Sequence, residues 1–172
     1  MIHAASFKPD PVNHRALRTA LGRFATGVTV VTTRTPGGKI EGLTANSFSA
    51  VSLDPPLVLW SLKRNAPSLP SFQASGYFAV NVLAKTQEEI AHRFATSHRE
   101  KFAGIEHAPG LGGAPLLHGT LAAFECSIES TIEGGDHVIF LGRVHRASQR
   151  DGEPLIFSAG RYGTHSALTP LS

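Results

Sequence analysis

One stretch of the chain, from Gly42 to Arg64, concentrates short polar side chains around a proline-containing bend. Hydroxyl, amide and backbone N–H groups gathered at one bend, with cations a strand away, can hold a phosphate without a dedicated glycine loop. The groups that could do so are Thr44, Asn46, Ser47, Ser49, Ser52, Ser61, Lys63 and Arg64. The alternative is an exposed hairpin whose serines face water, because Ser and Thr are ordinary surface residues.

Other chemistries find less support in the spacing of the residues. None of the nine histidines stands at HxH, HxxxH or HExxH spacing, and His92 and His98, six residues apart, would not share a helix face. Cys126 has no CxxC companion, so the sequence predicts no bound metal. There is no GxSxG motif, and the side chains of Asp136 and His137 should diverge in a strand, which argues against a serine hydrolase. The GxGxxG fingerprint of a Rossmann unit is also absent.

The elements that must position these groups include few helices. We predict helices over residues 13–25 and 86–97, with a short helical turn within 66–72. In the first helix, which Asn13 can cap, Leu17, Leu21 and Phe24 share one face. In the second, Thr86 and Glu89 have the spacing of a capping box.

Strands make up most of the predicted structure. We expect them over residues 28–33, 40–47, 77–83, 116–132, 138–147 and 154–158, the last being the final strand, with a loop over 102–119. The pair Pro55-Pro56 should interrupt the polar stretch, because proline has no amide hydrogen for a sheet ladder. Short strands joined by hairpin turns indicate a mainly β fold, an antiparallel barrel with a few peripheral helices, and not a doubly wound sheet.

Composition bounds the class of protein. The 172 residues suit one globular domain, which we expect over 14–166 between tails at 1–13 and 167–172. The net charge of +3 is spread along the chain without a run of Lys and Arg, so we expect no nucleic-acid partner. No apolar run approaches the roughly 20 residues that span a bilayer, and the first residues do not form a secretory signal, so we expect no membrane partner. The single cysteine, Cys126, excludes an internal disulfide and favours the cytoplasm.

The polar stretch belongs to a longer pattern. The segment GLTANSFSAVSLDPPLVLWSL, residues 42–62, resembles the signature of the short-chain flavin reductases, the small NAD(P)H-using partners of two-component flavin monooxygenases. Four further pieces match in the same order, at residues 24–32, 78–83, 134–137 and 160–162, so that the resemblance covers roughly 17–163. It implies an FMN-binding split barrel of Greek-key topology. It also implies a homodimeric NAD(P)H:flavin oxidoreductase that reduces FMN or FAD and supplies the reduced flavin to a separate monooxygenase. NADH is favoured over NADPH, because no pair of arginines marks a clamp for a 2′-phosphate.

The resemblance also implies roles for individual residues. The segment Thr44-Ala45-Asn46-Ser47 should line the flavin, and Ser52 and Ser61-Leu62-Lys63 should contact its ribityl chain and phosphate. Further phosphate candidates are Ser68, Arg93 and Lys101, although Arg93 could equally be a solvated helix residue.

A histidine that follows Gly-Gly-Asp at the start of a strand is commonly a structural hydrogen-bonding group. The resemblance instead places His137 at the nicotinamide side of the site, where an imidazole could donate to the coenzyme's amide or pyrophosphate. Tyr162 is expected to pack beside His137, or else to belong to the core.

The chain departs from the family pattern at two positions. Trp60 replaces a small residue or cysteine, and Phe157 replaces a tyrosine. Because aromatic residues are enriched at interface centres, we expect Trp60 and its strand to lie in the dimer interface. Two other classes remain open: a split-barrel flavoprotein that acts as an electron carrier or redox sensor, and a heme binder or a protein related to pyridoxamine-phosphate oxidases.

Overall fold

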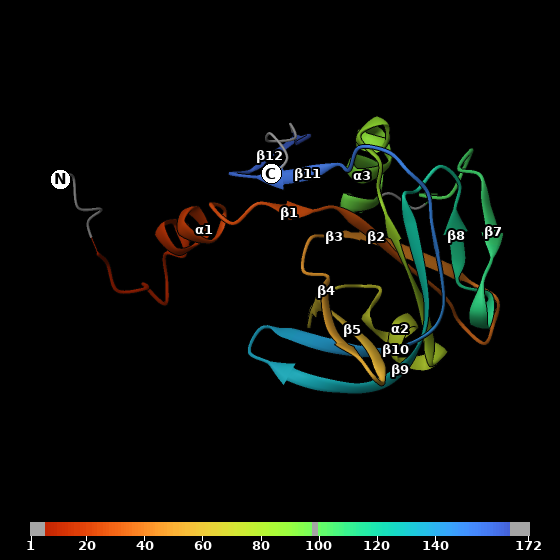
Figure 1. Ribbon diagram of the computed structural model, residues 1–172. Coiled ribbons are helices and arrows are strands. Elements are labelled where there is room, and N and C mark those ends of the chain that lie inside the picture. Colours follow the sequence, from red (N-terminus) through yellow and green to blue (C-terminus); the bar gives the residue numbers. More distant parts are fainter. Residues whose placement is uncertain (1–5, 98–99, 166–172) are drawn as a thin grey trace.

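A seven-stranded antiparallel sheet forms the body of the molecule in the computed structural model, which describes residues 6–97 and 100–165 (Figure 1). The predicted tail at 167–172, the first five residues of the predicted N-terminal tail and His98 therefore lie outside the described residues. The strand order is β3-β2-β6-β9-β10-β5-β4, and every neighbouring pair is antiparallel. The strands are β2 (Thr29–Arg34), β3 (Ile40–Ala45), β4 (Ser49–Leu53), β5 (Pro56–Lys63), β6 (Tyr77–Val82), β9 (Ala122–Gly134) and β10 (His137–Gln149). The predicted mainly β, antiparallel class is confirmed.

The sheet is curled into an open barrel. Strands β3 and β4 are its two edges, yet only residues 46–48 separate them in the chain. Because an extended chain spans at most about 3.6 Å per residue, a connection this short brings the two edges close together. The Ser47 side chain holds the connection in place, since its Oγ accepts a hydrogen bond from the N–H of Ser61 on β5 at 2.9 Å.

Two hydrophobic clusters cover the two faces of β2, which explains why five of its six residues are buried. Val31 lies in the first cluster, inside the barrel, whereas Val28 and Val30 lie in the second, beneath helix α3 (Glu88–Ala95). This arrangement follows from the alternation of side chains along a strand. A continuous run of β-branched residues is therefore typical of a strand covered on both sides.

Trp60 lies at the centre of the first cluster and has no exposed surface. Its ring stacks on Phe140 at 4.8 Å between centroids and meets Phe72 edge-on at 4.9 Å. The expectation that Trp60 belongs to a dimer interface is therefore wrong. On β5 every second side chain points into the barrel, and Trp60 occupies one of these inward positions between Val58 and Leu62.

The helices differ from prediction in length and in capping. Helix α1 (Arg15–Leu21) ends at Gly22 instead of continuing to Ala25, and none of its residues is buried. Asn13 still accepts a hydrogen bond from the N–H of Arg15 at 3.1 Å. Helix α2 (Leu69–Ser75) is longer than the single turn expected, because its Pro70 stands in the first turn, where no amide hydrogen is needed.

The start of α3 corrects the predicted capping box. A short 3₁₀ turn, η1 (Lys85–Gln87), precedes the helix, and Gln87 Oε1 accepts the N–H of Ala84 at 3.0 Å. The cap thus lies two residues before the Thr86–Glu89 pair, and the helix ends at Ala95, before Ser97.

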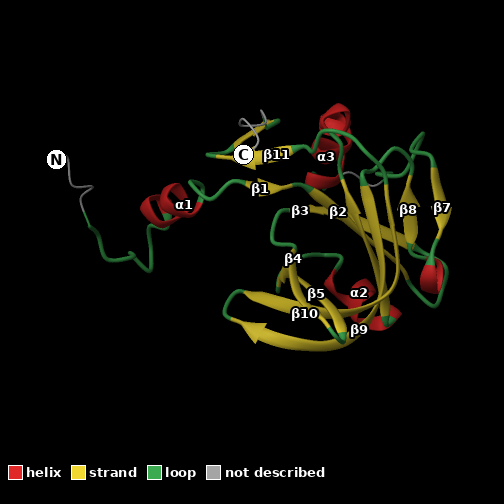
Figure 2. Cartoon of the chain, in the orientation of Figure 1, coloured by secondary structure: helices red, strands yellow, loops and turns green. Residues whose placement is uncertain are grey.

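Short strands complete the fold (Figure 2). They are β1 (Thr26–Gly27), β11 (Ile156–Ser158) and β12 (Arg161–Gly163) in one sheet, and β7 (His107–Pro109) and β8 (Pro115–Leu117) in another, with the 3₁₀ turn η2 (Leu111–Gly113) between them. The predicted loop over 102–119 thus contains a hairpin, and the strand predicted over 154–158 is followed by one more. No helix in the described part of the chain is long and apolar enough to cross a membrane.

Candidate functional site

A cavity of about 570 Å³ opens where the polar stretch of the sequence meets the end of α3. This volume lies within the range of about 300–1,000 Å³ that is typical of small-molecule sites. Ten of the predicted site residues line it: Thr44, Ala45, Asn46, Ser47, Ser61, Leu62, Lys63, Ser68, Lys101 and His137. They come from five separate segments, namely the end of β3, the end of β5, the residues before α2, the loop after α3 and the start of β10.

The hydroxyl groups of the β3–β4 bend are hydrogen-bonded within the protein. The Ser47 hydroxyl accepts a hydrogen bond from the N–H of Ser61 and also donates one to the carbonyl oxygen of Ser61 at 3.3 Å. The Thr44 hydroxyl donates to the carbonyl of Ala91 on α3 at 2.6 Å. These two side chains therefore fix the cavity wall to β5 and to α3, whereas Asn46 between them is exposed.

Lys101 adds a positive charge to the lining of the cavity. Its Nζ donates to the carbonyl oxygens of Gly42 on β3 and Phe94 on α3, both at 3.1 Å. Burial lowers the pKa of the Lys101 ammonium, and the nearby charge of Glu41 opposes this shift. An ammonium group has three N–H donors, so these two bonds leave a third N–H for an anion in the cavity.

Lys63 and His137 are neighbours in the lining, where they are paired in register across β5 and β10. The His137 Nδ1 atom lies 2.8 Å from Oδ1 of Asp136. The hydrogen bond from His137, followed by the charges of His137 and Lys63, lowers the pKa of the Asp136 carboxyl. An ionised carboxylate can only accept, so the hydrogen of this bond resides on Nδ1 and the imidazole's other nitrogen, Nε2, is left for other contacts.

The Asp136–His137 contact corrects the expectation that the two side chains diverge. Alternation applies within a strand, but β10 begins at His137 and Asp136 still belongs to the turn that follows Gly135. Gly135 has a positive φ of 70°, a conformation that glycine adopts without steric cost. The turn therefore directs the carboxylate toward the imidazole.

Three predicted site residues do not line the cavity. Ser52 lies on β4 opposite Leu57, on the far side of the bend. Arg93 is exposed and donates through Nη1 to the carbonyl of Ala103 at 2.7 Å.

Tyr162 does not lie with His137 on the cavity wall. Its ring meets that of His92 on α3 at 4.8 Å and that of Phe157 at 5.3 Å, so it joins β12 to the outer side of α3. Burial raises the pKa of the Tyr162 hydroxyl, with a smaller contribution from the charge of Glu88.

Sequence reasoning missed part of the lining. The missed residues are Glu41, Leu43, Ala66, Pro67 and residues 94–97 at the end of α3. Glu41 and Leu43 are two residues apart on β3, so their side chains lie on the same face of that strand. The strand predicted over 40–47 could therefore have indicated both. The end of α3 could not be found in this way, because only the tertiary packing of α3 against β3 brings it to the cavity.

The residues of this cavity fit a phosphorylated flavin. Two ammonium groups, from Lys63 and Lys101, can neutralise a phosphate, and the amide of Asn46 offers donors to a heterocycle. Apolar side chains provide surfaces for an aromatic ring system: Leu43, Ala45, Leu62, Ala66, Pro67 and Phe94. Among the described residues, no cluster of His, Cys, Asp and Glu has the make-up of a metal site.

Comparisons with known proteins agree with this chemistry. The model of the family "Flavin reductase like domain" matches residues 21–166. The chain is 46% identical over 160 residues to the FMN reductase (NADH) SmoA of Agrobacterium fabrum, covering 93% of this chain and 91% of that protein. It is 42% identical over 154 residues to HsaB, the reductase subunit of a flavin-dependent monooxygenase from Rhodococcus jostii, covering 89% of this chain and 78% of the relative.

A solved structure extends the likeness to the whole backbone. The NADH:FAD oxidoreductase SgcE6 of Streptomyces globisporus superposes with a TM-score of 0.88 at 39% identity, covering 99% of this chain and 98% of that one. The same protein, determined in complex with NAD and FAD fragments, superposes with a TM-score of 0.86 at 40% identity and covers 96% and 98% of the two chains. The curled sheet, the cavity at its bend and these matches lead to one conclusion: the chain belongs to the flavin reductase-like family.

Proposed function

We propose that this protein is an NADH-dependent flavin reductase that reduces FMN or FAD and passes the reduced flavin to a separate monooxygenase component. The observation that carries the proposal is a cavity whose lining includes Lys63, Lys101 and His137. SmoA, an FMN reductase that uses NADH, shares 46% of its aligned residues with this chain, and the NADH:FAD oxidoreductase SgcE6 shares its fold.

The proposed reaction needs no acid, base or nucleophile from the side chains. A bound flavin supplies the redox chemistry, because its ring system accepts a hydride from NADH. The protein has to bind and orient the two molecules, since a productive geometry brings the reacting atoms to about 3–3.5 Å. This accounts for a cavity in which, among its described lining residues, none is arranged as a nucleophile with a general base.

Each group of lining residues has a distinct task in this proposal. Lys101, held by two carbonyl oxygens, and Lys63 bind the flavin phosphate, while Asn46, Ser61 and the bend that Ser47 anchors contact the rest of the cofactor. His137 contacts the nicotinamide coenzyme through Nε2, because Asp136 engages its Nδ1. Ser68 completes the lining beside the phosphate.

The proposed enzyme is a homodimer of the cytoplasm. An open barrel whose cofactor cavity lies at its edge gains cover from a second subunit. The thiol of Cys126 is free and buried, which suits a reducing compartment. Light scattering should return a mass of about 37 kDa, twice the 18.3 kDa of the chain. A monomer at micromolar concentration would contradict the dimer and leave the reductase proposal standing.

The decisive test is NADH oxidation under anaerobic conditions with FMN, FAD or riboflavin as acceptor. We expect reduction of FMN or FAD, and we expect Lys101→Met to weaken binding of FMN at least tenfold while riboflavin, which lacks the phosphate, is little affected. Lys85→Met is the matched control, because Lys85 is an exposed lysine that pairs with Glu153 outside the cavity. A protein that oxidises NADH with none of the three flavins would overturn the proposal, and a Soret band in its absorbance spectrum would favour heme instead.

A further inference from the structure

Glu41 is a residue of the flavin cavity to which the proposed function gives no role. Among the described lining residues it is the one carboxylate, whereas Lys63, Lys101 and His137 supply the basic groups. A negative charge in the lining of a phosphate site weakens binding, because it repels the ligand. The presence of this carboxylate therefore needs a physical reason.

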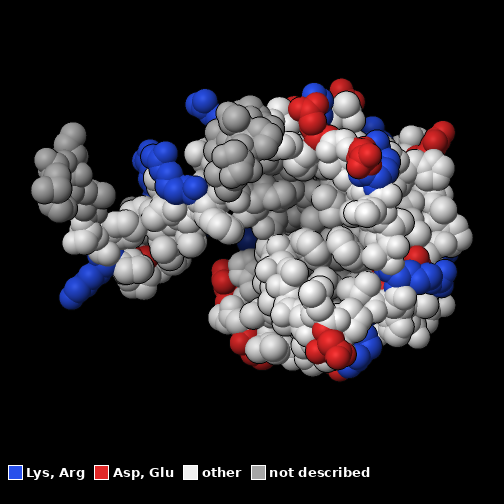
Figure 3. Space-filling model, viewed as in Figure 1, with Lys and Arg blue, Asp and Glu red and all other residues white. Residues whose placement is uncertain are grey.

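An ion pair holds the Glu41 carboxylate in place. Its Oε1 atom lies 2.5 Å from Nζ of Lys39, two residues earlier in the chain. Ion pairs also occur elsewhere on the body of the molecule, where Figure 3 shows acidic and basic groups together at the surface. Glu41 differs from a surface carboxylate because its side chain is only 19% exposed, while that of Lys39 is 70% exposed. The carboxylate thus belongs to the cavity and its lysine partner to the solvent.

Glu41 lies close enough to Lys101 to act on its charge. The Nζ atom of Lys101 donates to the carbonyl oxygen of Gly42, the next residue along β3, at 3.1 Å. Burial lowers the pKa of the Lys101 ammonium, and the charge of Glu41 raises it. Because the carboxylate pairs with Lys39, it influences Lys101 through space and leaves the remaining N–H of the ammonium to a ligand.

The repulsion from a fixed carboxylate depends on the charge of the ligand. The phosphate of FMN is a monoester with close to two negative charges at pH 7, whereas a phosphate within the pyrophosphate of FAD carries about one. Riboflavin has no phosphate. By Coulomb's law, the free-energy penalty from Glu41 is about twice as large for the FMN phosphate as for an FAD phosphate in the same place. Lys63 and Lys101 favour the ligand of higher charge, and Glu41 offsets part of that preference.

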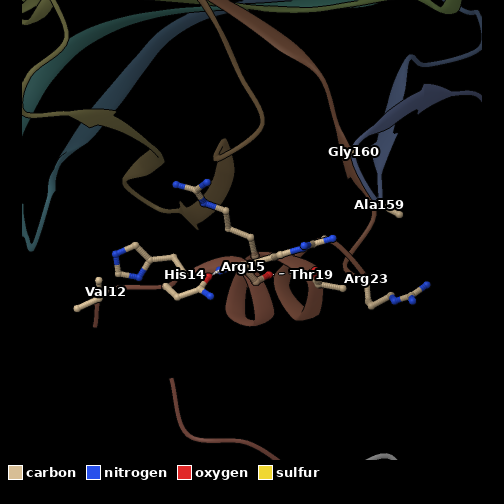
Figure 4. Close-up of a pocket in the computed structure, with 10 residues that line it drawn as sticks. Val12, His14, Arg15, Thr19, Arg23, Ala159 and Gly160 are labelled. Carbon is tan, nitrogen blue, oxygen red and sulfur yellow. Dashed lines mark hydrogen bonds between the residues drawn. The ribbon is translucent and has the colours of Figure 1, made fainter. Parts of the chain in front are cut away.

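A second hollow of the molecule lacks this balance. It has a volume of about 810 Å³ and lies between α1 and the turn at Ala159-Gly160 (Figure 4). Its described lining contains Arg15, Arg18 and Arg23 and no acidic residue. Such a lining attracts every anion in proportion to its charge. The flavin cavity is therefore the one of these two in which a carboxylate opposes the cations.

We propose that Glu41 is a specificity-determining residue, which lowers the affinity of the cavity for FMN more than for FAD. Lys39 is a positioning residue, because it acts through the carboxylate that it holds. This inference rests on the flavin reductase proposed above and adds how its cavity discriminates between the two flavins.

Equilibrium titration of Glu41→Gln with riboflavin, FAD and FMN at pH 7 tests this role. Glutamine keeps the shape of the side chain and removes its charge. We expect the dissociation constant for riboflavin to change by less than about twofold, that for FAD to fall about threefold and that for FMN to fall about tenfold. Fluorescence quenching of the flavin measures all three constants.

Two control variants separate this effect from a change in overall charge. Glu153→Gln removes the same charge from an exposed carboxylate that pairs with Lys85 outside the cavity, and all three constants should stay as in wild type. Arg18→Gln removes a cation from the hollow of Figure 4 and should also leave them unchanged. A charge-graded loss of affinity in Arg18→Gln would place the phosphate in that hollow and overturn the proposal.

The graded response is the result that a purely structural role would not give. Equal changes for the three flavins, or unchanged constants in Glu41→Gln, would overturn the proposal while the reductase stands. A protein that binds none of the flavins would overturn both. Lys39→Met should weaken FMN binding in the wild-type background and have little effect in the Glu41→Gln background. Additive effects of the two substitutions would contradict the positioning role of Lys39.

Discussion

His137 and Asp136 are neighbours in the chain, yet their side chains form a hydrogen bond of 2.8 Å between Nδ1 and Oδ1 at the edge of the cavity. A histidine that only closed the turn would need no particular tautomer. Here the ionised carboxylate fixes the hydrogen on Nδ1 and leaves Nε2 for other contacts. The turn that joins β9 to β10 therefore prepares one nitrogen for a ligand.

The substitution His137→Asn tests that role. If Nε2 contacts the coenzyme, the Michaelis constant for NADH should rise while flavin affinity stays near wild type. Loss of one contact worth about 1–3 kcal/mol corresponds to roughly five- to 150-fold in kcat/KM. Stopped-flow reduction of bound flavin at several NADH concentrations separates the parameters. Asp136→Asn should change kcat/KM in the same direction but less. Unaltered kinetics in His137→Asn would mean that the imidazole only braces the turn.

The bend residue Ser47 gives a second prediction. Its hydroxyl both accepts from and donates to the backbone of Ser61, so Ser47→Ala should loosen the bend and weaken binding of FMN or FAD at least tenfold. Fluorescence quenching of the flavin measures the dissociation constant. Ser52→Ala is the comparison: family resemblance assigns Ser52 to the phosphate, whereas its position on β4 outside the cavity lining predicts a smaller effect. Equal dissociation constants for wild type and Ser47→Ala would remove the bend from the cofactor site.

Cys126 gives a prediction about pH. Burial raises the pKa of its thiol from 9.0 to about 12, with a smaller effect from Glu125. The unfolded chain therefore loses this proton near pH 9 while the folded protein retains it, so the thiol's contribution to stability is complete below that pH and declines as the pH rises. Relative to Cys126→Ala, the free energy of unfolding should fall by about 1.4 kcal/mol between about pH 8 and about pH 10. Urea titrations of both proteins measure the difference. Parallel pH profiles would show that the thiol ionises equally in both states.

Gly42 gives a prediction about packing. A Cβ atom at this position would lie 2.7 Å from Cε1 of Phe94 and 3.1 Å from Cζ of Phe102. Gly42→Ala should therefore push α3 from β3 and cost about 1–3 kcal/mol of stability. It should also weaken flavin binding, because Lys101 reaches the carbonyl of Gly42. Gly27→Ala is the control, since nothing lies within 4 Å of its added Cβ. Melting temperatures that match between the two variants would contradict this account.

Local sequence signals predicted the strands well and the helices less well. A run of β-branched residues correctly predicted β2, and a pair of prolines correctly predicted the break before β5. Both signals depend only on the backbone preferences of a few neighbouring residues. The sequence predicted an apolar face with Leu21 and Phe24, but it could not show that the helix stops at Leu21 or that both side chains stay exposed among residues 6–97 and 100–165. Trp60 shows the opposite case: an aromatic residue expected at an interface fills the barrel instead, because the pleat of β5 turns it inward.

The candidate site was predictable where it follows one continuous segment. Residues 44–47 and 61–63 reach the cavity because the bend and the neighbouring strand are local features. His137 and Lys101 were predicted as site residues only with the resemblance to a family. The spacing of the residues alone would not have placed them near residues 44–47 and 61–63. For Tyr162 the sequence left two placements open, and the structure has the second: Tyr162 packs against the second hydrophobic cluster and not beside His137, because β12 packs against α3.

The three residues that connect β3 to β4 have a consequence for engineering. They join the two edges of one sheet, so their number limits how far the barrel can open, while the hydrogen bonds of Ser47 hold the connection in place. Each inserted residue lengthens the tether by at most about 3.6 Å. A library that varies only the length of this connection would widen the cavity mouth in small steps. Such variants could accept bulkier ring systems without the replacement of a residue that contacts the ligand.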